Sequence, residues 1–148
     1  MNREIKFRGK SIDEWVYGML CKVNEGDTEH GEPIKYKIQT DEKEYGEYVQ
    51  YFITDENTIG QYTGLHDKNG KKIYEGDIVL YQDWEMAYEG GGNDSFINKG
   101  IVEYCEDNCC YNVTERQTVD ITDVLYKDNE DLEVIGNIYD NPELLGGE

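Results

Sequence analysis

The stretch that decides the fold is residues 67–81, DKNGKKIYEGDIVLY. Its Asn69-Gly70 pair is typical of a two-residue type I′ hairpin, because both central positions of that turn need a positive φ. Gly76 allows a sharp bend further on, and Asp77 can accept local backbone N–H groups before the apolar run 78–81. Many small SH3-like barrels enter a strand through such a glycine–aspartate step, so this stretch predicts an SH3-like barrel.

Short runs in which apolar and polar residues alternate surround this stretch, as in strands that bury one face. Turn residues separate the runs at short intervals, which favours an all-β sandwich or barrel. The segment 83–98 contains three consecutive glycines and predicts a loop. For residues 121–127 a strand and a helical turn both stay open. The alternating runs are 5–7, 34–38 and 119–121, and the denser apolar runs, which are more like central strands, are 15–23, 48–54, 78–81 and 101–104.

The C-terminus carries the signals of a short helix. Asp140 or Asn141 can cap it, and Pro142 suits its first position. We therefore expect an all-β chain with a short C-terminal helix, divided into an N-terminal β region (1–64) and a C-terminal SH3-like barrel region (65–148). We expect the two regions to share contacts or to form one integrated domain, because the aromatic runs before residue 64 need partners.

The chain of 148 residues is strongly acidic, with 14 basic and 33 acidic side chains and a net charge of −19. The acids are concentrated in residues 65–148, which hold 20 of them and 6 basic groups. Such a surface repels phosphate backbones and attracts basic proteins, so we expect protein partners and no direct nucleic-acid binding. An alternative interpretation is that the negative charge serves only to keep the protein soluble. No apolar run is long enough to cross a membrane.

Sequence motifs for catalysis or metal binding are absent. Cys105 and Cys109 have C-x-x-x-C spacing but no second ligand pair, so we expect no zinc and no cofactor. No export signal is recognisable, so reduced thiols are expected. Glu75 and Asp77 lie two residues apart and, with His66, could line a small carboxylate site. We expect no catalytic residues and keep this enzyme as the weakest alternative.

Tyrosine is unusually frequent, with 13 residues. Tyrosine suits protein interfaces because it offers a large rigid area and a polar tip, although half-buried strands use it equally well. The candidate binding residues are Tyr62, Asp67, Tyr74, Glu75 and Asp77.

Residues 58–79 resemble the signature of the YopX family, and so do the segments 3–10, 15–18 and 135–145. The resemblance implies a small, mostly β protein encoded by phages and prophages. It also implies an uncharacterised function, with no assigned catalytic or ligand residues. Residues 83–98 and 105–131 match no part of the signature, so the specificity of this member is expected there.

The sequence thus favours a non-enzymatic phage or prophage accessory protein in the cytoplasm of the bacterial host. It would bind an unknown host or phage protein through an acidic, tyrosine-rich surface. A DNA mimic that inhibits a basic nucleic-acid-binding host protein is the alternative, and homo-oligomerisation is compatible with tyrosine-bearing strands.

Overall fold

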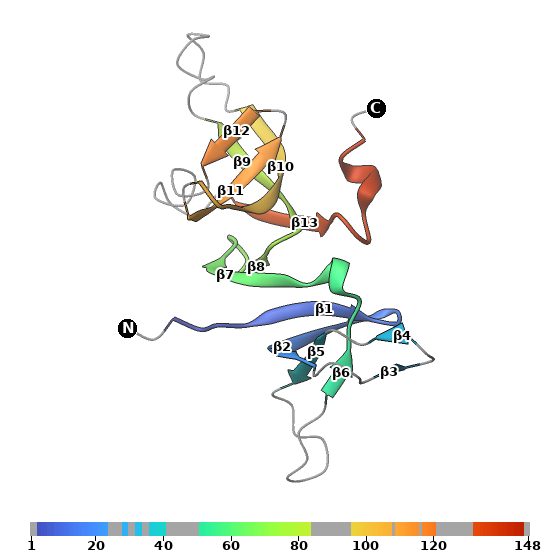
Figure 1. Cartoon of the computed structure of the whole chain (residues 1–148). Coiled ribbons are helices and arrows are strands. Elements are labelled where there is room, and N and C mark those ends of the chain that lie inside the picture. Colours follow the sequence, from blue (N-terminus) through green and yellow to red (C-terminus); the bar gives the residue numbers. More distant parts are fainter. Residues whose placement is uncertain are drawn as a thin grey trace. The chain divides into compact units, whose positions relative to one another are not determined.

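The structure, a computed structural model, divides the chain into two compact units, residues 1–62 and 63–148. Both units consist of antiparallel strands, so the all-β class is confirmed (Figure 1). Within the described part, no helix has the length and apolar character that a membrane crossing requires. The structure describes residues 3–23, 28–29, 32–33, 36–40, 51–83, 96–107, 109–115, 117–120 and 132–146.

The first unit is a meander that ends with a returning strand. Strand order is β6-β5-β2-β1-β7, and β3 and β4 form a separate two-stranded hairpin. The unit boundary falls inside β7, whose second half belongs to the next unit. The elements are β1 (Phe7–Ser11), β2 (Glu14–Lys22), β3 (Thr28–Glu29), β4 (Glu32–Pro33), β5 (Tyr36–Thr40), β6 (Tyr51–Ile53), the 3₁₀ turn η1 (Glu56–Thr58) and β7 (Gly60–His66).

Alternation along β2 sets the two faces of this sheet. Val16 and Gly18 are buried, whereas Tyr17 and Met19 between and after them are exposed. Cross-strand pairing continues the buried face, because Val16 lies opposite Gly9 and Leu20 lies opposite the fully buried Ile38. The sequence predicts a dense apolar run over 15–23, whereas the structure alternates buried and exposed residues along β2, as the pleat of a strand allows.

The β1–β2 turn holds a strained residue. Ser11 pairs with Glu14, which leaves Ile12 and Asp13 as the two-residue loop. Ile12 has φ 57° and is 94% exposed. Positive φ brings Cβ too close to the following carbonyl oxygen, and a β-branched side chain suffers most.

Replacing Ile12 with glycine will raise the free energy of unfolding by about 1 kcal/mol, because the left-handed strain disappears and no buried contact is lost. The matched control is Asp13→Gly, at the neighbouring position without a positive φ, which we expect to destabilise slightly. Urea denaturation of both variants measures the two effects. A less stable I12G variant would show that the turn does not carry this strain.

The second unit is a five-stranded sheet in the order β12-β11-β10-β9-β13, with β8 pairing on β7. In the part of the unit that the structure describes, β12 and β13 at its two ends are not paired with each other, so the expected barrel is not closed. A bulge between Val134 and Gly136 shifts the register of the edge strand β13. The elements are β8 (Lys72–Tyr74), β9 (Asp77–Asp83), β10 (Phe96–Cys105), β11 (Cys110–Glu115), β12 (Gln117–Asp120), β13 (Glu133–Asn137) and the 3₁₀ turn η2 (Pro142–Leu144).

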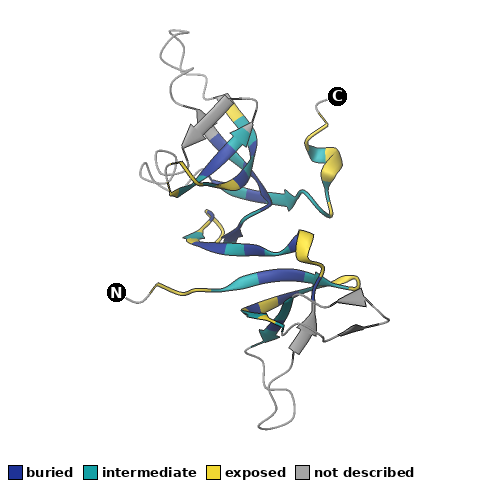
Figure 2. Ribbon diagram, in the orientation of Figure 1, coloured by how far each residue is buried: buried dark blue, intermediate teal, exposed yellow. Residues whose placement is uncertain are grey.

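The core of this unit is built by strands β8, β9, β10, β11 and β13 together with Leu132, and buried residues are dark blue in Figure 2. Leu65 and Tyr111 pack against it. The core residues are Ile73, Val79, Tyr81, Val102, Val113, Leu132 and Val134.

The Asn-Gly turn differs from the expected type I′ geometry. Gly70 has φ 78°, but Asn69 does not share the positive φ. The N–H of Gly70 donates to the carbonyl of Asp67, and Asp67 and Lys71 close a three-residue loop. This is a type I turn followed by a left-handed glycine. The Asp67 carboxylate causes the difference, because it accepts the N–H groups of Asn69 and Lys71.

Two further predictions concern the segment 83–98 and the C-terminal helix. The segment 83–98, predicted to be a loop, is strand at both ends, because β9 includes Asp83 and β10 starts at Phe96, and residues 84–95 lie outside the described part of the chain. The short C-terminal helix is one 3₁₀ turn, η2, with Asn141 as its cap and Pro142 at its start. Residues 121–127 lie outside the described part of the chain.

Candidate functional site

Asp67 is the most heavily bonded of the predicted binding residues. One carboxylate oxygen accepts the N–H groups of Asn69 and Lys71, each at 2.9 Å. The other accepts the N–H of Val134 at 3.0 Å, across 67 residues of sequence. The side chain is only 5% exposed. Asp67 therefore joins the β7–β8 turn to strand β13.

The charge of Asp67 is stabilised by these bonds. Burial alone would raise its pKa, but the N–H groups of Val134, Lys71 and Asn69 and the charge of Lys71 outweigh burial and hold the pKa below its usual value. Hydrogen bonds to a carboxylate favour its ionised form. The site is therefore an anionic anchor for the backbone at neutral pH.

Asp77 plays a similar part at the next turn. Its carboxylate accepts the N–H of Tyr74 at 2.8 Å, as the sequence predicts for an aspartate that follows Gly76. Gly76 has φ 83°, and the N–H of Gly76 donates to Val102 while its carbonyl accepts from Ile138. Asp77 is 1% exposed. The turn 74–77 thus connects β8 and β9 to strand β10 and to Ile138, the residue that follows β13.

The remaining predicted residues lie in different surroundings. Tyr62 is buried and belongs to the first unit, whereas Tyr74 is buried in the second. Glu75 is half-buried, and His66, the third member of the weaker carboxylate-site alternative, is exposed. Asp67, Tyr74 and Asp77 all take part in the hydrogen bonds of the turns before and after β8. This is what the three residues have in common in the structure. Their role in binding stays a prediction.

A more accessible candidate lies at the end of the β10–β11 hairpin, which we call the hairpin tip and define as residues 104–111. Tyr104 is 47% exposed, and its ring contacts Tyr111 edge-on, with ring centroids 5.4 Å apart and planes at 68°. Tyr111 in turn packs against the core. The exposed ring is therefore held by a half-buried neighbour that packs against the core, which limits its rotation.

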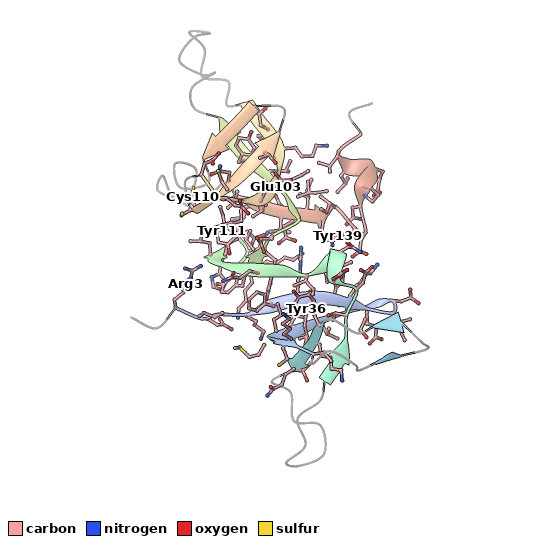
Figure 3. All side chains as sticks on the ribbon, in the orientation of Figure 1. Arg3, Tyr36, Glu103, Cys110, Tyr111 and Tyr139 are labelled. Carbon is pink, nitrogen blue, oxygen red and sulfur yellow. The ribbon has the colours of Figure 1, made fainter. Side chains whose placement is uncertain are left out.

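Strand alternation divides the hairpin tip into two faces. Tyr104 and Tyr111 lie opposite each other on the face that carries Val102 and Val113. The other face carries Glu103 and Cys110; Figure 3 labels both, together with Tyr111. The first of these surfaces is the tyrosine face, and the second is the thiol face.

Two exposed carboxylates follow the exposed tyrosine in the chain. Glu106 and Asp107 lie in the turn after Cys105. The negative charge of the neighbouring Cys109 raises the pKa of Tyr104, and partial desolvation, a hydrogen bond with the Cys109 thiol and the charges of Cys110 and Glu106 act in the same direction. On the thiol face, Glu103 accepts the hydroxyl of Thr114 at 2.9 Å. The tip therefore combines an exposed phenol with exposed acidic side chains.

Three of the four cysteines lie at this tip. Cys105 is directly opposite Cys110 in the strand register. Cys109 has φ 53°, and its thiol donates to the carbonyl of Glu106 at 3.6 Å. None of these three cysteines is in a disulfide. Among the described residues, no group of three or more histidine, cysteine, aspartate or glutamate side chains is placed to hold a metal ion.

The open face of the first unit carries a different surface. The Arg8 guanidinium lies 4.7 Å from the centre of the Trp15 ring, a cation–π contact. Tyr17, opposite Arg8 in the register, is 41% exposed, and Met19 is also exposed. This unit therefore supplies a second exposed tyrosine, remote in sequence from the hairpin tip.

Sequence reasoning did not select the residues of the hairpin tip. The strand 101–104 was expected, but period two alone does not say whether Tyr104 or Glu103 faces the core. The sequence did contain a signal for this hairpin, because a polar stretch lies between a Tyr-Cys pair at 104–105 and a Cys-Tyr pair at 110–111. That symmetry is typical of a hairpin with matching side chains across its strands.

These features define a class of protein, namely a two-unit, all-β protein with an acidic, tyrosine-bearing hairpin. The family model described as YopX protein matches residues 6–146, so the chain belongs to the YopX family. The crystal structure of protein EF1440 from Enterococcus faecalis is similar, at 24% identity and a TM-score of 0.49, covering 97% of this chain and 99% of that one. The search of curated proteins gave no match.

Proposed function

We propose that this protein is a non-enzymatic binding module that captures a basic host or phage protein at the hairpin tip. The observation that carries the proposal is the Tyr104 ring, exposed yet held edge-on by the core-packed Tyr111. An exposed aromatic side chain that is already ordered loses little conformational entropy on binding. More of the free energy gained by burying it therefore contributes to affinity. Tyrosine is accordingly frequent among residues that dominate interfaces.

The charge of the tip supports a basic partner. Glu106 and Asp107 are exposed beside Tyr104, and the whole chain carries a net charge of −19. A field of this sign accelerates encounter with positively charged surfaces and weakens with added salt. We expect the tip acids to act mainly on the association rate, and Tyr104 mainly on dissociation.

The family resemblance supports the biological setting of the proposal. Phages and prophages of bacteria encode proteins of this kind, and we propose that the chain acts in the cytoplasm of the bacterial host. Its target is a protein and not a nucleic acid, because the acidic surface opposes phosphate.

Replacing Tyr104 with alanine will weaken binding of the partner by about tenfold or more, as expected for an interface anchor. Immobilised wild-type protein captures partners from host lysate, mass spectrometry identifies them, and surface plasmon resonance compares the variants. The matched control is Tyr17→Ala, which removes an equally exposed tyrosine from the first unit. Equal capture by wild type and Y104A would overturn the proposal.

A second pair of variants tests the charge. Reversing Glu106 and Asp107 to lysine will slow association, whereas reversing the exposed Asp13 of the β1–β2 turn will not. Duplex DNA added as a competitor distinguishes the DNA-mimic alternative, because a mimic would share its partner's binding site with DNA. Competition that persists in the Y104A variant would favour the mimic over the hairpin-tip proposal.

A further inference from the structure

Two thiols on the thiol face are placed as a disulfide requires. Cys105 and Cys110 are directly opposite each other on neighbouring antiparallel strands. Residues opposed in this way have Cα atoms about 4.5–5.5 Å apart. Disulfides need a Cα separation of about 4.4–6.8 Å. Neither cysteine is in a disulfide and both are half-buried, and because the two Cα ranges overlap the bond can form without moving the strands apart.

The third thiol of the tip lies on the other face. The Cys109 thiol donates to the carbonyl of Glu106 and shares a hydrogen bond with Tyr104, which belongs to the tyrosine face. The Cys110 thiol donates instead to the side-chain oxygen of Asn112 at 3.3 Å, on the thiol face. Cys109 is therefore turned away from Cys105 and Cys110, and the cross-strand pair is the favoured one.

We propose that Cys105 and Cys110 form a reversible modification site, a dithiol that reacts with low-molecular-weight disulfides and closes into a cross-strand disulfide. The inference goes beyond the proposed binding function and does not require a partner. Its chemistry can be measured on the isolated chain, so failure here leaves the result of the binding experiment unaffected.

The reaction proceeds through two exchanges. The thiolate of one cysteine attacks a sulfur of the small disulfide, whose S–S bond breaks and releases one thiolate. The second cysteine, as thiolate, then attacks the protein sulfur of the mixed disulfide, forming the Cys105–Cys110 bond and releasing the other small thiolate. The dithiol loses two electrons, the small disulfide gains them, and the two thiol protons end on the two released thiols.

The hairpin favours the second step over accumulation of the mixed disulfide. The strand register holds both sulfurs near each other before reaction, so the closing attack is intramolecular and has a high effective concentration. Cys109, exposed and on the other face, reacts with the same reagent but lacks a resolving thiol. It is therefore expected to remain as a mixed disulfide with one half of the reagent, whose other half leaves as a thiolate.

The test treats the folded full-length chain with oxidised glutathione, blocks remaining thiols with iodoacetamide and maps the peptides by mass spectrometry. We expect the Cys105–Cys110 link at about tenfold or more over any other link, because only this pair is pre-aligned. Dithiothreitol should restore both thiols. In the C105S variant, Cys110 should instead retain one glutathione.

The matched control is Cys21→Ser, which removes the thiol of the first unit and should leave the map unchanged. The same reaction in concentrated urea reports on the role of the fold, since the preference for one link should then vanish. A predominant Cys109–Cys110 link, or glutathione retained on both Cys105 and Cys110 of the wild type, would overturn the proposal.

Discussion

Replacing Asp67 with alanine will lower the free energy of unfolding by about 3 kcal/mol or more. The substitution removes an ionised acceptor from three backbone N–H groups, those of Asn69, Lys71 and Val134. Hydrogen bonds to charged groups contribute about 1.5–3 kcal/mol, and buried donors left without a partner add a desolvation cost. Chemical denaturation followed by tryptophan fluorescence and circular dichroism measures the loss.

Asparagine at position 67 will give an intermediate loss. One amide oxygen can still accept from Asn69 and Lys71, as asparagine does in similar turns. The amide NH₂ group then faces the N–H of Val134, and because both groups are donors they form no hydrogen bond with each other. D67N thus removes the long-range bond while it keeps the local turn. Equal stabilities of D67N and wild type would show that the link to β13 contributes nothing.

The pH dependence of stability provides a second measurement on the same residue. The pKa of Asp67 is lower in the folded chain than in the unfolded chain. Its contribution is therefore complete above the unfolded value of about 3.9 and is lost as the pH falls through the folded value. The difference in stability between wild type and D67N should shrink on acidification. A difference that grows with acid would contradict the assignment.

The matched control is Asp55, whose carboxylate caps η1 by accepting the N–H of Asn57 at 3.0 Å. This side chain is exposed and makes the same kind of local bond, without the long-range contact of Asp67. Alanine at position 55 should cost only about 1 kcal/mol, as removal of a helix cap usually does.

Alanine at position 18 will destabilise the first unit by about 3 kcal/mol. A Cβ atom on Gly18 would lie 1.8 Å from the carbonyl oxygen and 2.7 Å from the carbonyl carbon of Gln39, on strand β5. Backbone atoms cannot rotate away as a side chain can, so β2 and β5 must separate at this point. Forced insertion of a methyl group into packed structure typically costs about 1–3 kcal/mol.

Hydrogen exchange locates this effect as well as measuring its size. Amides of β2 and β5 in the G18A variant should exchange faster, while those of the second unit keep their protection. The control is Gly146→Ala, where the nearest atom to a new Cβ is the Glu143 carbonyl oxygen at 3.7 Å. Unchanged protection along β2 and β5 would show that this close approach is absent in solution.

Much of the fold was predictable because neighbouring residues encode it. In β5, Ile38 is buried between the less buried Lys37 and Gln39, as expected for a strand that continues the alternation of 34–38. The turn before Asp77 was predictable for the same reason, because the glycine and the carboxylate act within four residues of each other. The type of the Asn-Gly turn was not, since the Asp67 side chain competes with the intrinsic preference of the pair.

The candidate site was less predictable, because burial depends on contacts between distant strands. Asp67 and Asp77 look like surface carboxylates in the sequence, yet they lie at 5% and 1% exposure with backbone partners. Tyr104 looks like any strand tyrosine, but its position beyond the core leaves it exposed. The signature segment 58–79 thus contains Asp67 and Asp77, which anchor the backbone, whereas the exposed Tyr104 lies outside this segment.

The sequence by itself determined the all-β class, the main turns and the acidic character, since alternation, glycine geometry and charge act locally or add over the chain. Only the tertiary structure decided which carboxylates anchor the backbone, which tyrosines are exposed and which two cysteines lie opposite each other. Those outcomes depend on strand register and on long-range bonds such as Asp67 to Val134, and a shift of one residue would exchange the faces.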